Sequence, residues 1–489
     1  MKGLKIITAA LTLVNALRVS GEPVSPATAS APPQRPNVLF IVLDDLRPEL
    51  GCYGHPQIKS PVMDSLAAGG LVFERAYCQQ SLCGPSRVSF LTGCRPDKLR
   101  IYGMSNQHRI EWRDTRKGIT SLPEQFRQHG WTAVSYGKVY DDRLGLDAKF
   151  SWDECVEGWQ KQFALPENVV QWQHSLASKA VREPVVECAD VPDETYTDGH
   201  VANLALEFIR KQADGKPFFL AVGFPKPHLP FVAPKKYWDL YQREAIRLPA
   251  IRTHFPGATE FTFSPYKEIF DYDVINPNAD EKTTELIHGY FACISYVDAQ
   301  IGKIVAALKQ KGLYDNTIIV LLGDNGWKLG EYGEWAKSTN LELDARVPLI
   351  IRLPGLASTK PQSYALVELL DVLPTVCEAA GIPVPASAEG RSLLPIFHDP
   401  AATVNDMALT QYPRSGCMGY SIRTGQWRYT EWRHNENGAV EARELYDLST
   451  SPIETNNVAE AFPDMAKALS RKIDHLLKQQ IRLTVKPIL

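Results

Sequence analysis

Short and almost wholly apolar runs alternate with segments of helical periodicity through most of the chain. Five such runs end at charged or turn residues: 38–43, 132–136, 218–224, 317–322 and 347–353. Runs of this length are typical of strands buried on both faces, because helices cover both sides of a parallel sheet. The pattern therefore predicts an α/β fold, with a large mixed and mostly parallel sheet flanked by helices.

Helical segments fit between these runs. One is expected over 60–70, where Ser-Pro opens the segment and Gly-Gly ends it. A second opens at Ser121, which forms a capping box with Glu124. Residues 285–311 carry apolar side chains at helical spacing and predict a long helix.

The pattern changes at about residue 404. Short, aromatic-rich strands are predicted over 419–424, 427–432 and 444–448, followed by a terminal helix. This succession indicates a small antiparallel sheet. We therefore expect a catalytic domain over 36–403 and a C-terminal subdomain over 404–489.

The N-terminal segment has the features of a secretory signal peptide. A short basic head precedes the apolar stretch 6–17, which is too short to span a membrane. A segment rich in proline, alanine and serine follows. We expect a signal peptide over 1–21, a linker over 22–35, and a secreted or periplasmic protein. Because no cysteine lies near that junction and no later run of about eighteen apolar residues appears, no membrane anchor is expected.

Charge and cysteine content narrow the possibilities further. The formal net charge of −3 gives no electrostatic footprint for nucleic acid. Nine cysteines are an odd number for an exported protein, so one thiol is expected to have a role of its own. Cys155 and Cys188 flank a polar, insertion-like segment. A disulfide that closes it is one possibility, and free thiols are the other.

The segment 82–93 carries the most specific chemistry in the chain. Its sequence, Leu-Cys-Gly-Pro-Ser-Arg-Val-Ser-Phe-Leu-Thr-Gly, places Cys83 just ahead of a predicted helix that Gly93 ends. The free amides and the dipole at a helix N-terminus favour an anion. Arg87 adds a guanidinium fork, which binds tetrahedral oxyanions well. These features predict that an anion is handled at Cys83.

This segment resembles the Cys-X-Pro-Ser-Arg and Leu-X-Thr-Gly motif of the type I, formylglycine-dependent sulfatases. The resemblance extends over nearly the whole mature chain. It implies an alkaline-phosphatase-like fold and hydrolysis of sulfuric esters. In that family a maturation enzyme oxidises the cysteine to formylglycine, whose hydrated aldehyde is the nucleophile. The resemblance implies this role for Cys83, with the formylglycine-generating enzyme as a partner.

Several charged and amide residues come directly after the C-terminal ends of the predicted strands. They are Asp44, Asp45, Lys138, His228, Asp324 and Asn325, with Lys337 shortly after. In an open parallel sheet, ligands bind outside the carboxyl ends of the strands. We therefore expect these side chains to gather with Cys83 at one edge of the sheet.

The oxygen ligands among them suit a hard cation, Ca²⁺ or possibly Mg²⁺, better than Zn²⁺. The predicted metal ligands are Asp44, Asp45, Asp324 and Asn325, and the resemblance adds the residue derived from Cys83. Three cations, Lys138, Lys337 and Arg87, would balance the carboxylates and hold a sulfate. His228 is the candidate acid for the leaving alcohol, because histidine titrates near neutrality.

Within the family, the segments 218–223, 226–228, 330–337 and 418–424 are most similar to the iduronate-2-sulfatases, which act on heparan and dermatan sulfate. An exo-acting enzyme on sulfated saccharides is therefore the first expectation. Aromatic rings pack on sugars and arginine binds uronate carboxylates. On these grounds the predicted substrate rim contains Trp327, Trp335, Arg346 and Asp141, with Arg47 beside it.

Three positions depart from that branch of the family. Asn325 replaces a histidine, Tyr140-Asp141 stands where a histidine is expected after Lys138, and Tyr332 replaces another. A sulfatase for choline, aryl or algal polysaccharide sulfate therefore remains an alternative. A phosphonate or phosphate ester hydrolase with the same machinery is another, and a non-catalytic sugar-sulfate binding protein is a third. A cysteine phosphatase would separate its cysteine and arginine by five residues, and Arg87 lies only four positions beyond Cys83, which is too close.

Overall fold

The structure is a computed structural model of the full chain. It describes residues 35–104, 113, 118–141, 143, 145, 147–157, 162–212, 215–356 and 361–485. The unit Arg35–Leu489 contains all of the described residues. The predicted signal peptide and all but the last residue of the predicted linker lie outside the described residues.

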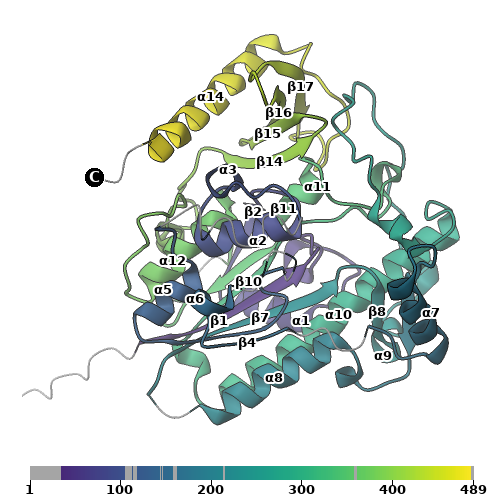
Figure 1. The fold of residues 1–489 in the computed structure, drawn as a ribbon, viewed down its shortest axis with the longest axis vertical. Helices are drawn as coiled ribbons and strands as arrows, with labels where there is room; N and C mark the ends of the chain where they lie inside the picture. Colours follow the sequence, from purple (N-terminus) through teal and green to yellow (C-terminus); the bar gives the residue numbers. More distant parts are fainter. Residues whose placement is uncertain are drawn as a thin grey trace, which may run out of the picture. The chain divides into compact units, whose positions relative to one another are not determined.

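A nine-stranded sheet forms the centre of the compact unit (Figure 1). Its strands run in the order β11-β2-β12-β10-β1-β7-β3-β4, with β13 paired to β2. Their bounds are β1 Asn37–Asp44, β2 Leu71–Tyr77, β3 Thr132–Gly137, β4 Glu154–Val156, β7 Phe218–Pro227, β10 Thr317–Gly323, β11 Arg346–Val347, β12 Leu349–Arg352 and β13 Gln362–Glu368. Short two-stranded sheets pair β5 Glu183–Pro184 with β9 Tyr272–Asp273, and β6 Val186–Ala189 with β8 Phe231–Pro234.

Helices cover both faces of this sheet. Their bounds are α1 Pro61–Ala68, α2 Cys83–Thr92, α3 Pro96–Leu99, α5 Leu122–Gln128, α6 Ala148–Ser151, α7 Pro166–Ala177, α8 Thr197–Lys211, α9 Lys235–Trp238, α10 Asp280–Gln310, α11 Glu342–Ala345, α12 Val372–Ala379, α13 Leu394–His398 and α14 Pro463–Val485. The 3₁₀ turns are η1 Gly51–Tyr53, η4 Asp193–Thr195, η5 Arg243–Ala245, η6 Glu268–Asp271, η7 Tyr314–Asn316, η8 Glu331–Gly333 and η9 Leu369–Asp371.

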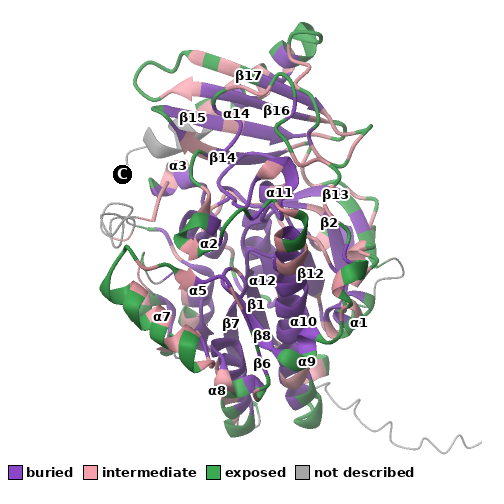
Figure 2. Cartoon of the chain, turned by 90° about the vertical axis from the view of Figure 1, so that its right-hand side faces the viewer, coloured by how far each residue is buried: buried purple, intermediate pink, exposed green. Residues whose placement is uncertain are grey.

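Strand β1 shows why the sheet has two cores. Successive side chains of a strand point to opposite faces. Leu39 and Ile41 accordingly lie in the core formed with α1, α8 and α10. Val38 and Phe40 lie in the core formed with α2, α5 and α12. Burial on both faces accounts for the uninterrupted apolar run in the sequence, and Figure 2 shows the central strands buried throughout.

The strands next to β1 bring the predicted site residues together. β1 pairs in parallel with both β10 and β7, and β7 pairs in parallel with β3. The carboxyl ends of all four strands therefore lie at one edge of the sheet. On the other side of β10 the pairing turns antiparallel, to β12 and then to β2. The mixed and mostly parallel sheet predicted from the sequence is confirmed.

Several local predictions are also confirmed. The helix predicted over 60–70 is α1, and the predicted capping box at Ser121 and Glu124 opens α5. The run at 347–353 differs, because it is divided between β11 and β12. The long predicted helix is α10, which begins five residues earlier, at Asp280. By length and hydropathy α10 could cross a membrane, but 78% of its most apolar window is buried inside the structure, as in a core helix.

The C-terminal part contains the predicted antiparallel sheet. Its strands are β14 Ala408–Arg414, β15 Cys417–Arg423, β16 Trp427–His434 and β17 Val440–Asp447, in sequence order. The amphipathic helix α14 covers this sheet, and Leu469 and Ile473 are buried against it. Buried Glu342 of α11 accepts hydrogen bonds from Tyr77 and Arg428, so it links the two sheets.

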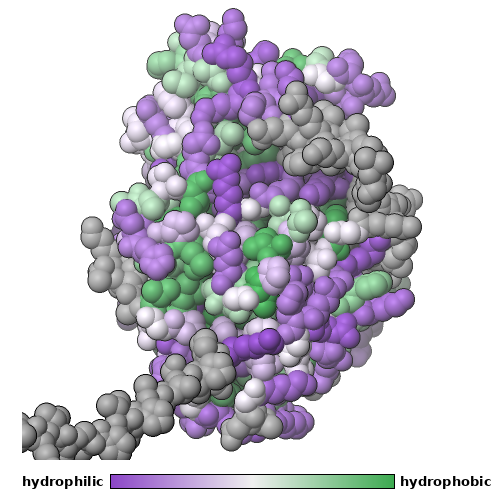
Figure 3. Space-filling view, turned by 90° about the vertical axis from the view of Figure 1, so that its left-hand side faces the viewer, coloured by the Kyte–Doolittle hydropathy of each residue, from purple (hydrophilic) through white to green (hydrophobic). Residues whose placement is uncertain are grey.

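The possible disulfide between Cys155 and Cys188 does not form in this structure. Both side chains are free thiols, Cys155 on β4 and Cys188 on β6. On the face shown in Figure 3, hydrophilic and hydrophobic side chains of the described residues are interspersed.

Candidate active site

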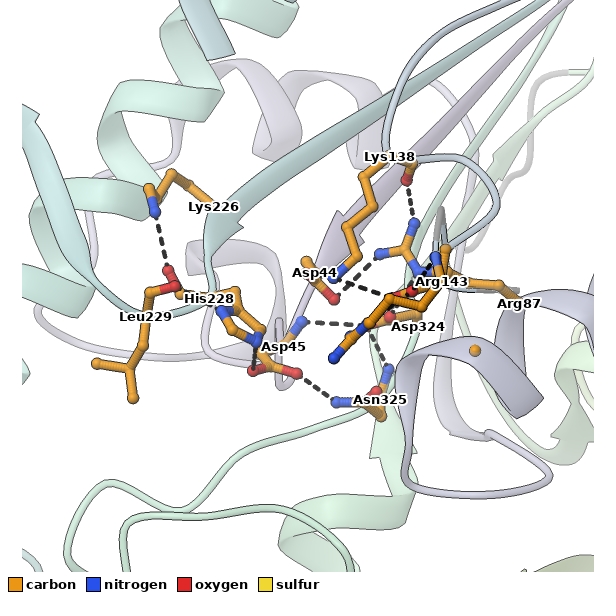
Figure 4. A network of polar contacts seen from close by, with 12 residues as sticks. Asp44, Asp45, Arg87, Lys138, Arg143, Lys226, His228, Leu229, Asp324 and Asn325 are labelled. Atoms are coloured by element: carbon orange, nitrogen blue, oxygen red, sulfur yellow. Dashed lines mark hydrogen bonds and ion pairs between the residues drawn. The ribbon is translucent and has the colours of Figure 1, made fainter. Parts of the chain in front are cut away.

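Two pairs of residues at neighbouring strand ends form the floor of the site (Figure 4). Asp44 and Asp45 end β1, and Asp324 and Asn325 follow β10. Asp45 adopts a left-handed backbone with φ 59°, and its amide donates to Asp324 Oδ1 at 3.0 Å. Asn325 Nδ2 donates to Asp45 Oδ1 at 2.6 Å. The parallel pairing of β1 with β10 thus brings together residues about 280 positions apart in sequence.

Helix α2 presents Cys83 to this floor. The helix begins at Cys83 and ends at Gly93, which has the left-handed conformation that glycine adopts readily. Ser86 fixes the first turn by donating to the Asp324 carbonyl at 2.6 Å. Cys83 is 1% exposed, and its sulfur lies within 4.8 Å of an Asp44 oxygen and a His228 nitrogen. Burial, with Asp44 nearby, raises the pKa of this thiol well above its usual range.

Arg87 contacts the carboxylates that we predicted it would balance. Its guanidinium is fully buried and donates to Asp324 from Nε at 2.8 Å and to Asp44 at 3.1 Å. Its remaining contacts are to the Lys138 and Val139 carbonyls. Because these acceptors engage every nitrogen of the fork, Arg87 organises the carboxylates. The contact between Arg87 and a sulfate stays a prediction.

Two buried lysines contact the carboxylates. Lys138, after β3, forms an ion pair with Asp44 and lies 3.4 Å from Asp141. Lys337 contacts both oxygens of Asp45, at 2.6 and 2.8 Å. Burial alone would lower the pKa of each lysine, but the adjoining carboxylates raise it above its usual value. Both side chains are therefore ammonium ions.

His228 and Glu268 complete the group. His228 Nε2 lies 2.9 Å from Glu268 and 3.7 Å from Asp45. Burial and Lys337 would lower the pKa of His228, but these two carboxylates raise it above its usual value. Glu268 belongs to η6, in an irregular part of the chain, and the sequence analysis did not single it out. A short motif beside a strand could be found in the sequence, but a lone glutamate in a loop carries no such signal.

The residues present fit a hard divalent cation. Oxygens of Asp44, Asp45 and Asp324 lie within 4.8 Å of one another. Asn325 Oδ1 is buried, and no side chain or backbone group of the described residues donates to it. A buried acceptor without a partner is costly, and a cation would satisfy it. All of these donors are oxygens, which favours Ca²⁺ or Mg²⁺.

The pKa values of the carboxyl groups at the floor of the site are shifted by burial and by the charges around them. Burial would raise the pKa of Asp44, but Lys138 and Arg87 lower it well below its usual range. Burial and the two neighbouring carboxylates instead raise the pKa of Asp324, despite the opposing effect of Arg87. Three carboxylates this close repel one another, and a divalent cation would relieve that repulsion.

Comparisons with known proteins agree with this geometry. The sulfatase family model matches residues 36–382. The chain belongs to the sulfatase family. A second model, for the C-terminal region of N-sulphoglucosamine sulphohydrolase, matches residues 330–482. Iduronate 2-sulfatase of Homo sapiens is 32% identical to this sulfatase, over 86% of this chain and 90% of its own length.

Solved structures show the same fold. A structure in complex with its substrate D-glucosamine-2-N,6-O-disulfate has a TM-score of 0.72 at 22% identity, covering 92% of this sulfatase and 99% of that chain. The phosphonate monoester hydrolase of Agrobacterium radiobacter has a TM-score of 0.69 at 22% identity, covering 91% and 96%. The predicted alkaline-phosphatase-like α/β fold is therefore confirmed.

The predicted substrate rim of this sulfatase is only partly brought to the site. Trp327 is 1% exposed, but its ring lies 5.3 Å from Lys337 Nζ and beside His228, so it forms a wall of the site. Trp335 is equally buried and donates to Asn278 at 2.9 Å, which makes it a core residue. Arg346 is engaged by Glu74. These contacts do not support a rim position for Trp335 or Arg346.

Asp141 binds Arg143, an arginine that was not predicted from the sequence. Asp141 is buried beside Lys138 and accepts two hydrogen bonds from Arg143, both at 2.9 Å. The Arg143 side chain is 52% exposed. Figure 4 shows Arg143 beside Asp44, Arg87 and Asp324. An exposed cation that was not predicted from the sequence therefore lies beside the site.

The substituted tyrosines and Arg47 are structural. Tyr140 is 2% exposed and packs near Trp152. Tyr332 is 1% exposed, and its hydroxyl donates to the Glu454 carbonyl. Arg47 lies behind the site and donates to the Trp327 carbonyl at 3.2 Å. Since both tyrosines are buried, their side chains do not account for a difference in substrate.

Proposed function

We propose that this sulfatase hydrolyses a sulfate ester at the end of a sulfated saccharide, with a 2-O-sulfated uronate as the first substrate to test. The observation that supports this most is the grouping of Cys83 with three carboxylates and the cations Lys138, Lys337 and His228. Such a group can hold a cation and an oxyanion side by side.

The proposed roles follow from position. Asp44, Asp45, Asp324 and Asn325 would hold Ca²⁺ or Mg²⁺, with the residue derived from Cys83 beside them. When bound, the cation would polarise a sulfate oxygen, and formylglycine at position 83 would supply the hydrated aldehyde as nucleophile. Carboxylates that bind a cation hold their lysines less tightly, so Lys138 and Lys337 could exchange part of these contacts for contacts with sulfate oxygens.

His228 would protonate the leaving oxygen. The ring lies within 4.8 Å of both Cys83 and Asp44, and it is held as an imidazolium by two carboxylates. An alcohol is a poor leaving group as an alkoxide, so a positioned acid accelerates its departure.

Arg143 and the relatives support the saccharide part of the proposal. Arg143 offers a partly exposed guanidinium beside the carboxylates of the site, which suits the carboxylate of a uronate or a neighbouring sulfate. Iduronate 2-sulfatase is the relative at 32% identity, and a solved relative of the same fold binds a sulfated glucosamine. The fold is shared with a phosphonate monoester hydrolase as well, so phosphonate esters belong in the same assay.

The test compares kcat/KM for one matured preparation on sulfated uronate disaccharides, sulfated hexosamines, algal fragments, choline sulfate, an aryl sulfate and a phosphonate monoester. We expect a 2-O-sulfated uronate to be turned over best and Arg143→Gln to raise KM for it more than for the aryl sulfate. A preference for choline or aryl sulfate over every saccharide would refute the saccharide proposal. A preference for a hexosamine would refute the uronate part alone.

We also propose that the protein is exported and then matured. The basic and apolar pattern of residues 1–21 supports this. N-terminal sequencing of protein from the extracellular or periplasmic fraction should begin within or just after the segment 22–35. Full-length protein that stays in the cytoplasm would contradict it.

A further inference from the structure

Glu268 belongs to the site, but unlike Asp44 and Asp324 it does not come from the end of a strand. It opens η6, and β9 follows directly and pairs with β5. Asp273 of β9 also accepts a hydrogen bond from Gln171 of α7 at 3.0 Å. The short turn that carries Glu268 is therefore fixed on its C-terminal side by a strand pair and a helix, rather than hanging free over the site.

Glu268 contacts two cations of the site, His228 and Lys337. Its Oε1 lies 2.9 Å from His228 Nε2, and its Oε2 lies 3.6 Å from Lys337 Nζ. The side chain is 18% exposed. Little water therefore competes with these interactions, and each is stronger than it would be on an open surface.

The other nitrogen of the His228 ring is held as well. Nδ1 lies 2.5 Å from the Leu229 carbonyl, which can only accept, so Nδ1 carries a hydrogen. Nε2 faces the carboxylates of Glu268 and Asp45. Asp45 also accepts hydrogen bonds from Lys337 and Asn325, which leaves Glu268 as the closer partner of Nε2. The ring is therefore fixed at both nitrogens.

We infer that Glu268 is a positioning residue, which orients the His228 ring through Nε2 and gives up this contact when the ester enters, so that the imidazolium donates its Nε2 hydrogen to the ester oxygen. This inference rests on the proposed function. As the bond from sulfur to the ester oxygen breaks, that oxygen keeps the electron pair and takes the Nε2 proton. Sulfur bonds to the attacking oxygen of the hydrated aldehyde, whose own hydrogen passes to a carboxylate of the site. The imidazole is left neutral, so its attraction to Glu268 weakens.

This role predicts a dependence on the leaving group. A sugar alkoxide needs the proton, and positioned acids contribute about 10²-fold or more to such steps. Nitrophenolate leaves as an anion and needs no proton. Loss of Glu268 should therefore slow the release of a sugar alcohol far more than that of nitrophenol. A loss of sulfate binding or of folding would slow both alike.

The experiment measures kcat on 4-nitrophenyl sulfate and on the best sulfated disaccharide for Glu268→Ala, Glu268→Gln and His228→Ala. Asp271→Asn is the matched control, because Asp271 lies in the same turn and binds the Tyr266 hydroxyl instead. For Glu268→Ala we expect about a 100-fold fall on the disaccharide and less than about a 5-fold fall on the nitrophenyl ester. Glu268→Gln keeps an acceptor oxygen and should lose less.

A double variant separates this role from a general one. Adding Glu268→Ala to His228→Ala should cost nothing further on the disaccharide, because both changes remove the same acid. Equal losses on both substrates, or additive losses in the double variant, would overturn the inference about Glu268. The proposed function would still stand in that case, provided that the wild type turns over the sulfated disaccharide. A wild type without turnover of either ester would refute the proposed function and, with it, this inference.

Discussion

Replacement of Arg87 by methionine tests how the site is built. The change removes a fully buried guanidinium that donates to Asp324 at 2.8 Å and to Asp44 at 3.1 Å, and it keeps most of the side-chain volume. Removing one partner of a buried ion pair typically costs about 3–5 kcal/mol, because the other charge stays buried. We therefore expect the free energy of unfolding to fall by about that amount in metal-free protein.

Calcium should restore part of this loss, because the cation neutralises the same carboxylates. A ligand at a hundred times its dissociation constant stabilises a folded protein by about 2.7 kcal/mol. The calcium-dependent stabilisation should be larger in the variant than in the wild type, since more negative charge is left uncompensated. Urea unfolding followed by tryptophan fluorescence, in chelator and in calcium, measures both quantities.

Arg95→Met provides the matched control. Arg95 forms a two-pronged pair with Glu368, at 2.7 and 2.6 Å, on a different part of the sheet. Its loss should lower the free energy of unfolding comparably, with no gain in response to calcium. If Arg87→Met unfolds within about 1 kcal/mol of the wild type and shows only a raised KM, the guanidinium binds the sulfate, and the structural argument fails. Arg87→Lys gives the milder test if the methionine variant does not fold.

Three further predictions concern metal, packing and pH. Asp324→Ala should reduce kcat/KM by several orders of magnitude. Chelation of metal from the wild type should do the same, and calcium or magnesium should restore the activity. Zinc as the only ion that restores activity would contradict the assignment of oxygen ligands. Trp335→Ala should lower the free energy of unfolding by about 3–5 kcal/mol without changing substrate preference, and a changed preference at unchanged stability would place the ring at the rim after all. Burial raises the pKa of Asp298 to about 7, above its unfolded value, so this carboxyl destabilises the fold once it ionises. The free energy of unfolding should therefore contain a contribution that falls as pH rises from about 4 to 7, and Asp298→Asn should abolish it; equal pH profiles for the two proteins would show that Asp298 titrates normally.

Much of the fold could be predicted because its central strands are buried on both faces. The runs at β1, β7 and β10 stand out as unbroken apolar segments, and parallel strands bring their carboxyl ends to one edge. Strand β2 was missed because it carries Glu74 and Arg75. Glu74 pairs with Arg346 across the antiparallel edge of the sheet, so this charged pair interrupts the apolar pattern.

The site residues that lie next to buried strands could also be predicted, and those in irregular segments could not. Asp44 and Asp324 directly follow strands, so their meeting follows from topology. Glu268 comes from a turn whose position depends on distant pairings, and nothing local distinguishes it. Arg87 was placed correctly in the chain, but its partners depend on side-chain directions that spacing does not specify. Trp335 shows the reverse error, because a ring next to a functional lysine in sequence points into the core.

The mass of the peptide that contains Cys83, taken from protein that turns over a sulfate ester, tests the central claim most directly. The account predicts that this peptide carries the aldehyde of formylglycine when the protein is made in a host with the maturation enzyme. It also predicts that protein from a host without that enzyme retains cysteine and is inactive. Full activity with unmodified Cys83 would contradict the account.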